Sequence, residues 1–156
     1  VRDRIDADYG TIFAGADRDI VQLATHNACQ YVGVGYGGRM RRLVTNLAAS
    51  GDVKPADIRE AARVIRDNDI RYVASGVFES QRPAQQLVRE TGVEAYFPVT
   101  PYAGVREEWV EEEWGYEQIA DNINMPTFEI VLGNETPEEA APSPAWLDQW
   151  RNFEPV

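Results

Sequence analysis

Four short strand-like segments alternate along this chain with longer segments that have helical character, and few folds accommodate that alternation. The predicted strands are residues 20–24, 42–47, 71–75 and 95–99, and the predicted helices between them are residues 26–36, 55–68 and 83–90. Such alternation is typical of right-handed βαβ units, whose strands pair in parallel. We therefore predict an α/β fold, a three-layer lobe with a four-stranded parallel sheet and helices on both faces.

The two ends of the chain carry weaker patterns. Residues 1–13 have the composition of a polar helix, and residues 116–123 are predicted to form another. From residue 134 the chain is rich in Glu, Ala and Pro, which is typical of a linker or a surface loop. A last short helix is expected to dock on the domain through an apolar set formed by Trp146, Leu147 and Trp150.

Composition excludes some classes of function. The 26 Asp and Glu residues outnumber the 15 Lys and Arg, for a formal net charge of −11, whereas a nucleic-acid binder needs a basic surface. No apolar run is long enough to predict a membrane span. Lys54 is the only lysine, and an acidic, arginine-rich surface favours a salt-adapted source. An ordinary acidic protein from a GC-rich genome is the alternative.

Candidate binding residues follow three of the predicted strands. His26, the only histidine, follows the first strand, Glu79 follows the third and Thr100 follows the fourth. Ligands of open α/β sheets bind beyond the carboxyl ends of the strands, so we expect these side chains at one edge. A single imidazole cannot build a zinc site, which takes about four ligands. A structural histidine and a solvated glutamate are the plainer interpretations.

Two further motifs point away from catalysis. Cys29, the only cysteine, excludes an internal disulfide and is expected to be a small buried hydrophobe. Gly33–Gly38 matches G-x-G-x-x-G, but these glycines follow a predicted helix and not a strand, as helix-ending glycines do. No G-x-S-x-G elbow, P-loop or H-E-x-x-H motif is present. We predict a protein that is not an enzyme.

Three stretches, taken in order, resemble one known family. Residues 23–33, with Tyr36–Gly37 after them, are similar to the H-x-x-F-x-Y…Y-G segment of the substrate-binding proteins of zinc and manganese ABC transporters. Residues 54–58 resemble the start of that family's long helix, and residues 71–80 resemble its strand and F-x-E loop. The resemblance covers roughly residues 1–125. The family includes adhesion lipoproteins.

This resemblance implies the C-terminal lobe of a two-lobe protein. Residues 1–14 would be the end of the helix that joins the lobes, and residues 15–133 would be the C-terminal α/β lobe. Residues 134–156 would be an acidic, Pro-containing tail with a short terminal helix. The family holds its metal in the cleft between the lobes, with two histidines from the N-terminal lobe. We expect a halophilic archaeal source, and an extracellular protein that is membrane-anchored at full length, while this chain itself is soluble.

The resemblance also implies roles for particular residues. His26 matches the first ligand of the C-terminal lobe, and imidazole suits Zn²⁺ better than Mn²⁺. Glu79 matches the acid of the third motif and is expected at the metal site. A role in supporting the cleft is expected in preference to direct ligation of the metal. Thr100 stands where the family often has its last carboxylate ligand, and Cys29 replaces the family's Phe.

The function implied is therefore that of the solute-binding component of an ABC importer for a divalent transition metal, zinc before manganese. Its partners would be the metal ion, the N-terminal lobe of the same protein and the membrane permease, and this lobe alone would not bind metal tightly. Two alternatives stay open. One is a nucleotide-binding or enzymatic α/β domain that uses Gly33–Gly38, and the other is a relative with a degenerate metal site.

Overall fold

The computed structural model describes residues 2–24, 35–41, 43, 53–100 and 107–154. The strands are β1 (Ile20–Gln22), β2 (Arg39–Arg41), β3 (Tyr72–Gly76) and β4 (Ala95–Val99). The helices are α1 (Arg2–Ala14), α3 (Pro55–Asp67), α4 (Arg82–Thr91), α5 (Glu107–Glu111), α6 (Tyr116–Ile119), the π-helix η1 (Ala120–Asn124), α7 (Met125–Val131), α8 (Pro137–Ala140) and α9 (Pro144–Trp150). Among these residues, no helix combines the length and apolar character needed to span a membrane.

The strands form two parallel pairs, and the prediction of one four-stranded sheet is wrong. β1 pairs with β2, and β3 pairs with β4. The two pairs meet at a single bridge between Leu23 and Ala74, where the Ala24 amide donates to the Ala74 carbonyl at 2.8 Å. Because β1 is only three residues long, it ends before a continuous ladder with β3 can form.

The strand β2 was not predicted, and it precedes the strand predicted over residues 42–47. β2 has the sequence Arg-Met-Arg, and its partner register is set by Ile20 opposite Arg39. Of the predicted range, only Leu43 is described, and it is buried. A short charged strand at a sheet edge carries no apolar alternation, so the pattern that predicts strands could not find it.

The four elements from α3 to β4 agree with the sequence prediction within two residues at each end. α3 begins at Pro55, and its buried face is Ile58, Ala61, Val64 and Ile65. α4 ends at Gly92, whose φ of +78° is the left-handed conformation that terminates helices. Of the helix predicted over residues 26–36, only Gly35 and Tyr36 are described, and both are helical.

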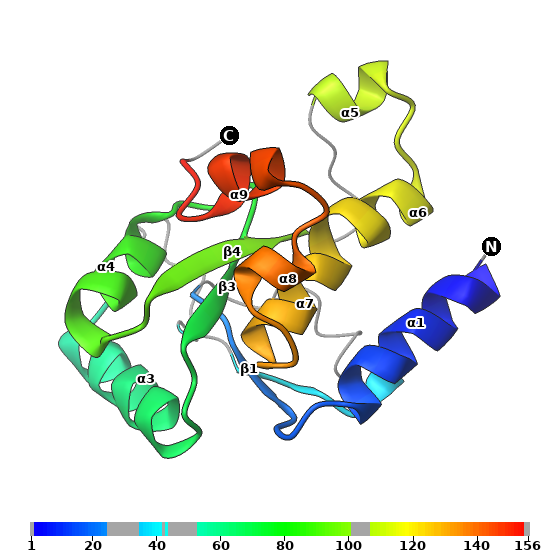
Figure 1. The fold of residues 1–156 in the computed structure, drawn as a ribbon. Coiled ribbons are helices and arrows are strands. Elements are labelled where there is room, and N and C mark those ends of the chain that lie inside the picture. Colours follow the sequence, from blue (N-terminus) through cyan, green and yellow to red (C-terminus); the bar gives the residue numbers. More distant parts are fainter. Residues whose placement is uncertain (1, 25–34, 42, 44–52, 101–106, 155–156) are drawn as a thin grey trace.

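Helices cover both faces of the strands. Figure 1 shows α3 and α4 on one side of β3 and β4, with α7 and α1 on the other. The side chain of Val73 belongs to the core cluster that contains α3 and α4, whereas that of its neighbour Ala74 belongs to the cluster that contains α1 and α7. Successive strand residues point to opposite faces, so both faces of this sheet are apolar.

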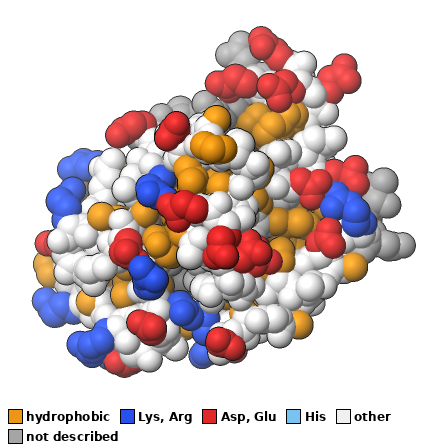
Figure 2. Space-filling view, viewed as in Figure 1, with side chains coloured by type: hydrophobic (Ala, Val, Ile, Leu, Met, Phe, Trp, Pro, Cys, Tyr) orange, Lys and Arg blue, Asp and Glu red, His pale blue; other side chains and the backbone are white. Residues whose placement is uncertain are grey.

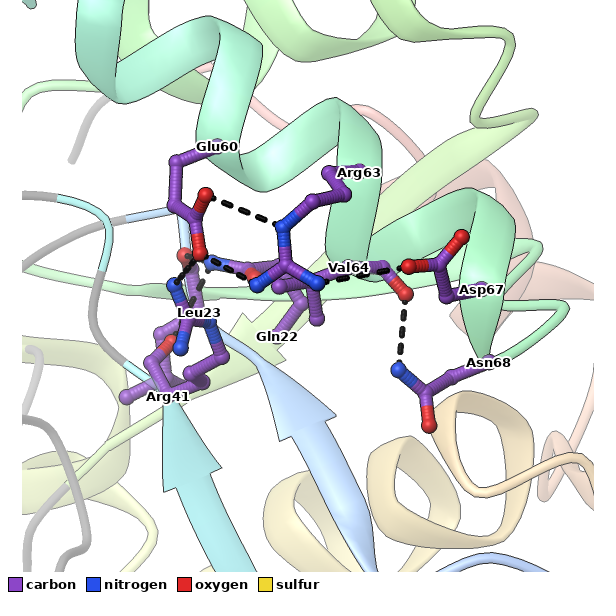
Figure 3. A network of polar contacts seen from close by, with 8 residues as sticks. All are labelled: Gln22, Leu23, Arg41, Glu60, Arg63, Val64, Asp67 and Asn68. Atoms are coloured by element: carbon purple, nitrogen blue, oxygen red, sulfur yellow. Dashed lines mark hydrogen bonds and ion pairs between the residues drawn. The ribbon is translucent and has the colours of Figure 1, made fainter.

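A polar network fastens β2 to α3 (Figure 3). Gln22 Nε2 donates to the Leu23 carbonyl at 2.8 Å and to the Arg41 carbonyl at 3.2 Å. Glu60 of α3 accepts from Arg41 at 3.1 Å and from Arg63 at 2.5 Å. The hydrogen bond from Arg63 is the main cause that lowers the pKa of Glu60, so this carboxylate stays charged at neutral pH.

The helix predicted over residues 116–123 extends further, as α6, η1 and α7 in succession. The π-helical turn lies just before Pro126, which has no N–H to continue an α-helical ladder. The Met125 amide donates to the Ala120 carbonyl, the wider spacing of a π-helix. This turn brings Asn124 into the buried interior, next to the end of β4.

The C-terminal segment packs on β4 and on the aromatic core. Trp146 and Trp150 of α9 are buried, and the Trp146 ring stacks on Phe97 with 5.9 Å between centroids. Asn152 borders β4: its amide donates to the Tyr96 carbonyl, and its side-chain Oδ1 accepts from the Tyr96 amide, both at 3.0 Å. The residues after α9 therefore satisfy backbone groups of an edge strand.

Candidate functional site

The carboxyl ends of β3 and β4 lie at one edge, where two of the three predicted binding residues follow them. Gly76 pairs with Val99 in the parallel register, and the Val77 amide continues the ladder by donating to the Val99 carbonyl at 3.0 Å. Glu79 therefore follows β3 and Thr100 follows β4 at the same edge. The third predicted residue, His26, lies outside the described residues, as does Cys29.

Glu79 lies in a tight turn between β3 and α4, and its side chain folds back over the end of the strand. Its amide donates to the Gly76 carbonyl at 3.2 Å. The carboxylate Oε2 is buried, and it would lie 3.0 Å from a Cβ placed on Gly76. A side chain at position 76 would therefore crowd the carboxylate and require it to shift.

Gln81 holds this turn through hydrogen bonds to its backbone, and the sequence did not indicate this role. Its side chain is fully buried, and Nε2 donates to the carbonyls of Gly76 and Glu79, both at 2.8 Å. The hydroxyl of Ser75 donates to Gln81 Oε1 at 2.5 Å. A glutamine at a helix start is usually exposed, so nothing in the local sequence indicated a buried amide.

Thr100 is buried and its backbone is held by Asn124. The Thr100 amide donates to Asn124 Oδ1 at 3.0 Å, and Asn124 Nδ2 donates back to the Thr100 carbonyl at 2.9 Å. The side chain of Thr100 is not accessible to solvent in this conformation. Sequence reasoning also missed Asn124, because its role depends on a π-helical turn that no sequence periodicity predicts.

The described end of the glycine run packs against α1. Gly37 has a φ of +82°, as expected of a glycine that ends a helix. A side chain on Gly38 would collide with the ring of Phe13, and the Tyr36 hydroxyl donates to Asp6 at 2.5 Å. These contacts are those of helix packing, and they do not favour a nucleotide-binding loop.

Two large apolar side chains are exposed among the described residues. Phe78, next to Glu79, is 47% exposed, and Val110 of α5 is 61% exposed. Figure 2 shows acidic side chains gathered over α5, as expected for the run at residues 107–114. Beneath them, Trp109 stacks on Trp114 with 5.1 Å between ring centroids. The α5 segment thus exposes acidic side chains and packs through the stacked rings of Trp109 and Trp114.

The described residues supply a single candidate metal ligand at this edge, Glu79. Within the ranges that the structure describes, no three His, Cys, Asp or Glu side chains are grouped so that they could hold a metal ion. One carboxylate supplies at most two of the roughly four donors that a zinc ion takes. Any metal site that uses Glu79 therefore needs further ligands from elsewhere.

Comparison with known proteins gives a family match and several structural neighbours. The family model described as zinc-uptake complex component A, periplasmic (ZnuA), matches residues 2–125. The metal-dependent lipoprotein YcdH of Bacillus subtilis superposes with a TM-score of 0.68 at 17% identity, over 83% of this chain and 48% of that chain. Among proteins with curated descriptions, none matches this sequence.

Two further structures were solved with metal bound. The Zn(II)-bound ZnuA-like domain of Streptococcus pneumoniae AdcA has a TM-score of 0.64 and 20% identity, over 83% of this chain and 47% of that chain. A Mn-bound periplasmic metal-binding protein of Candidatus Liberibacter asiaticus has a TM-score of 0.52 and 16% identity, over 84% and 46%. These likenesses concern the fold, and the chain spans about half the length of each neighbour.

Proposed function

Because this chain belongs to the zinc-uptake complex component A family, we propose that it is the C-terminal lobe of a receptor that delivers a divalent transition metal to an ABC importer. Members of this family are metal-binding solute-binding proteins and not enzymes, they work with ABC permeases, and they are of the periplasmic or extracellular lipoprotein type. The observation that carries the proposal is the family match over residues 2–125.

In this proposal α1 is the end of the helix that joins two lobes, and residues 15–133 are the metal-binding lobe. Residues 134–156 are a tail that packs on that lobe through α9. The N-terminal lobe of the same protein and the membrane permease are the partners, and the full-length protein is anchored at the cell surface. The fraction of each structural neighbour that this chain covers, close to half, supports a missing second lobe.

The metal is proposed to be zinc before manganese, with His26 and Glu79 as the residues of this lobe that reach it. Imidazole is a common ligand of Zn²⁺, whereas Mn²⁺ prefers oxygen ligands. The position of Glu79 at the carboxyl edge of β3 and β4 supports its part of the proposal. Two ligands leave half of a tetrahedral shell to water, so this lobe alone binds zinc weakly and closure against the other lobe completes the site.

One observation favours a second candidate, a family relative with a degenerate metal site. Thr100 occupies the place expected for a carboxylate ligand, yet its side chain is buried. A site that lacks this ligand would have lower affinity or a different cargo. Metal titration separates the two candidates, because a degenerate lobe would show no zinc binding that depends on His26.

We also propose a salt-adapted source, a halophilic archaeon. The support is the net charge of −11 and the use of arginine for every basic residue except Lys54. Salt screens the mutual repulsion of such a surface. The free energy of unfolding should therefore rise with KCl concentration from low to molar salt. A free energy that falls over that range would contradict the proposal.

The experiment for the metal site is a calorimetric titration of this chain with Zn²⁺ and with Mn²⁺ in high-salt buffer. We expect weak zinc binding that is lost in His26→Ala and weakened at least tenfold in Glu79→Ala, since both residues would be at the metal. Glu90→Ala is the matched control, because Glu90 is an exposed carboxylate of α4. Zinc binding that is the same in all variants would refute the assignment of both residues.

A further inference from the structure

Gln81 occupies the N-cap position of α4 but does not use its side chain to cap that helix. An N-cap residue normally accepts a hydrogen bond from the first turn of its helix through a side-chain oxygen. Here the Arg82 amide instead donates to the Ser80 hydroxyl at 3.3 Å. The side-chain amide of Gln81 therefore does not bond to the helix, and it points into the turn that carries Glu79.

The contacts of Gln81 span that turn from one end to the other. Nε2 donates to the carbonyl of Gly76, the last residue of β3, and to the carbonyl of Glu79 itself, both at 2.8 Å. These two bonds fix the distance between the strand end and Glu79. The third bond, from the Ser75 hydroxyl to Oε1, fixes the plane of the amide and directs Nε2 at the two carbonyls.

The side chain of Glu79 lies against this turn. Its Oε2 would lie 3.0 Å from a Cβ at Gly76, so the carboxylate rests directly on the strand end that Gln81 also contacts. Gln81 is fully buried, so it cannot itself reach a ligand in a cleft. Any effect of Gln81 on a ligand must therefore pass through the turn and through Glu79.

We propose that Gln81 is a positioning residue for metal capture: it holds the Glu79 carboxylate in the place from which it meets the metal. This inference rests on the proposed function, in which Glu79 belongs to the metal site. Residues that orient a metal ligand through hydrogen bonds typically change metal affinity by 10–100-fold when they are replaced. Gln81 acts on the backbone of the ligand turn, so we expect the lower end, about tenfold.

The test uses Gln81→Glu, which keeps the shape and the acceptor for Ser75 but removes both N–H donors. Gln86→Glu, the same chemical change at a partly buried position of α4, is the matched control. Zinc affinity is measured by titration of the whole chain followed by NMR, which detects weak binding. Hydrogen exchange of the Glu79 amide, bonded to the Gly76 carbonyl, is measured without metal. Because Gln81→Glu risks unfolding the lobe, Ser75→Ala is measured in parallel.

We expect Gln81→Glu to weaken zinc binding about tenfold and to speed exchange of the Glu79 amide, and Ser75→Ala to do both to a smaller degree. In a Glu79→Ala background the Gln81 substitution should change zinc affinity no further, because the two residues act through one path. A general structural effect would instead add to the loss in that background.

The outcomes distinguish a failure of this inference from a failure of the proposed metal site. If Glu79→Ala weakens zinc binding while Gln81→Glu and Ser75→Ala leave it unchanged, the positioning role is refuted and the metal site stands. An equal loss from Gln81→Glu in both backgrounds refutes it too, since the effect would bypass Glu79. If Glu79→Ala itself leaves zinc binding intact, the role of Glu79 fails and the inference fails with it.

Discussion

Substitutions at Asn152 should separate two contributions to the stability of the C-terminal segment. Its Oδ1 accepts the Tyr96 amide of β4 at 3.0 Å, and its own backbone has a φ of +54°. Asparagine tolerates this left-handed conformation, whereas alanine pays about 1–2 kcal/mol for it. The hydrogen bond to a buried strand is worth about 1 kcal/mol.

Three variants then have different expected costs. Asn152→Ala loses the hydrogen bond and adds the strain of a positive φ, so the free energy of unfolding should fall by about 2–3 kcal/mol in total. Asn152→Gly loses only the hydrogen bond, about 1 kcal/mol, because glycine adopts a positive φ without strain. Asn152→Asp keeps an acceptor and tolerates the same backbone, so its cost should stay within about 0.5 kcal/mol.

Urea unfolding followed by tryptophan fluorescence gives these free energies, in high salt so that the added charge of Asp is screened. With a slope of about 2 kcal/mol per molar urea, the midpoint of Asn152→Ala should fall by about 1 M. Equal losses for Ala and Gly would show that the backbone conformation costs nothing. No loss for Asn152→Gly would show that the bond to Tyr96 contributes nothing, because glycine removes that bond without backbone strain.

Two more predictions concern the core and the pH dependence of folding. Trp150→Ala should cost about 3–5 kcal/mol in urea unfolding, because the buried ring packs on Trp109 and Phe153, whereas exposed Gln149→Ala should cost less than about 0.5 kcal/mol. Burial raises the pKa of Glu129, so the charged form is penalised in the folded state above that pKa, and the penalty vanishes below the unfolded pKa. Glu129→Gln should therefore stabilise the protein at pH 7 and not near pH 3, and equal effects at both pH values in urea unfolding would contradict this cause.

Local patterns predicted the central elements well. The helices at α3 and α4 and the strands at β3 and β4 have strong signals within a few residues, such as Pro55 at a helix start and Gly92 at a helix end. The edge at which Glu79 and Thr100 lie also followed from the alternation of strands and helices, because parallel strands share a carboxyl edge. His26 stays a prediction, since it lies outside the described residues.

Features that depend on distant residues could not be predicted in this way. β2 was missed because a charged edge strand is defined by its partner, and the four-stranded sheet failed because the short β1 meets β3 at a single bridge. The burial of Thr100 was not foreseen either. Its backbone is paired with Asn124, which is 24 residues further along the chain and is turned inward by a π-helical segment.

The sequence thus established the α/β class and the shared edge of Glu79 and Thr100, because these depend on periodic burial and on glycine and proline signals between neighbours in the chain. Tertiary structure alone decided which polar groups are buried and paired. Gln81 joins Ser75 to the Glu79 turn, and Asn152 pairs with Tyr96 across 56 residues. Such hydrogen bonds satisfy individual buried groups, and they leave no periodic trace in the sequence because each depends on the packing of separate elements.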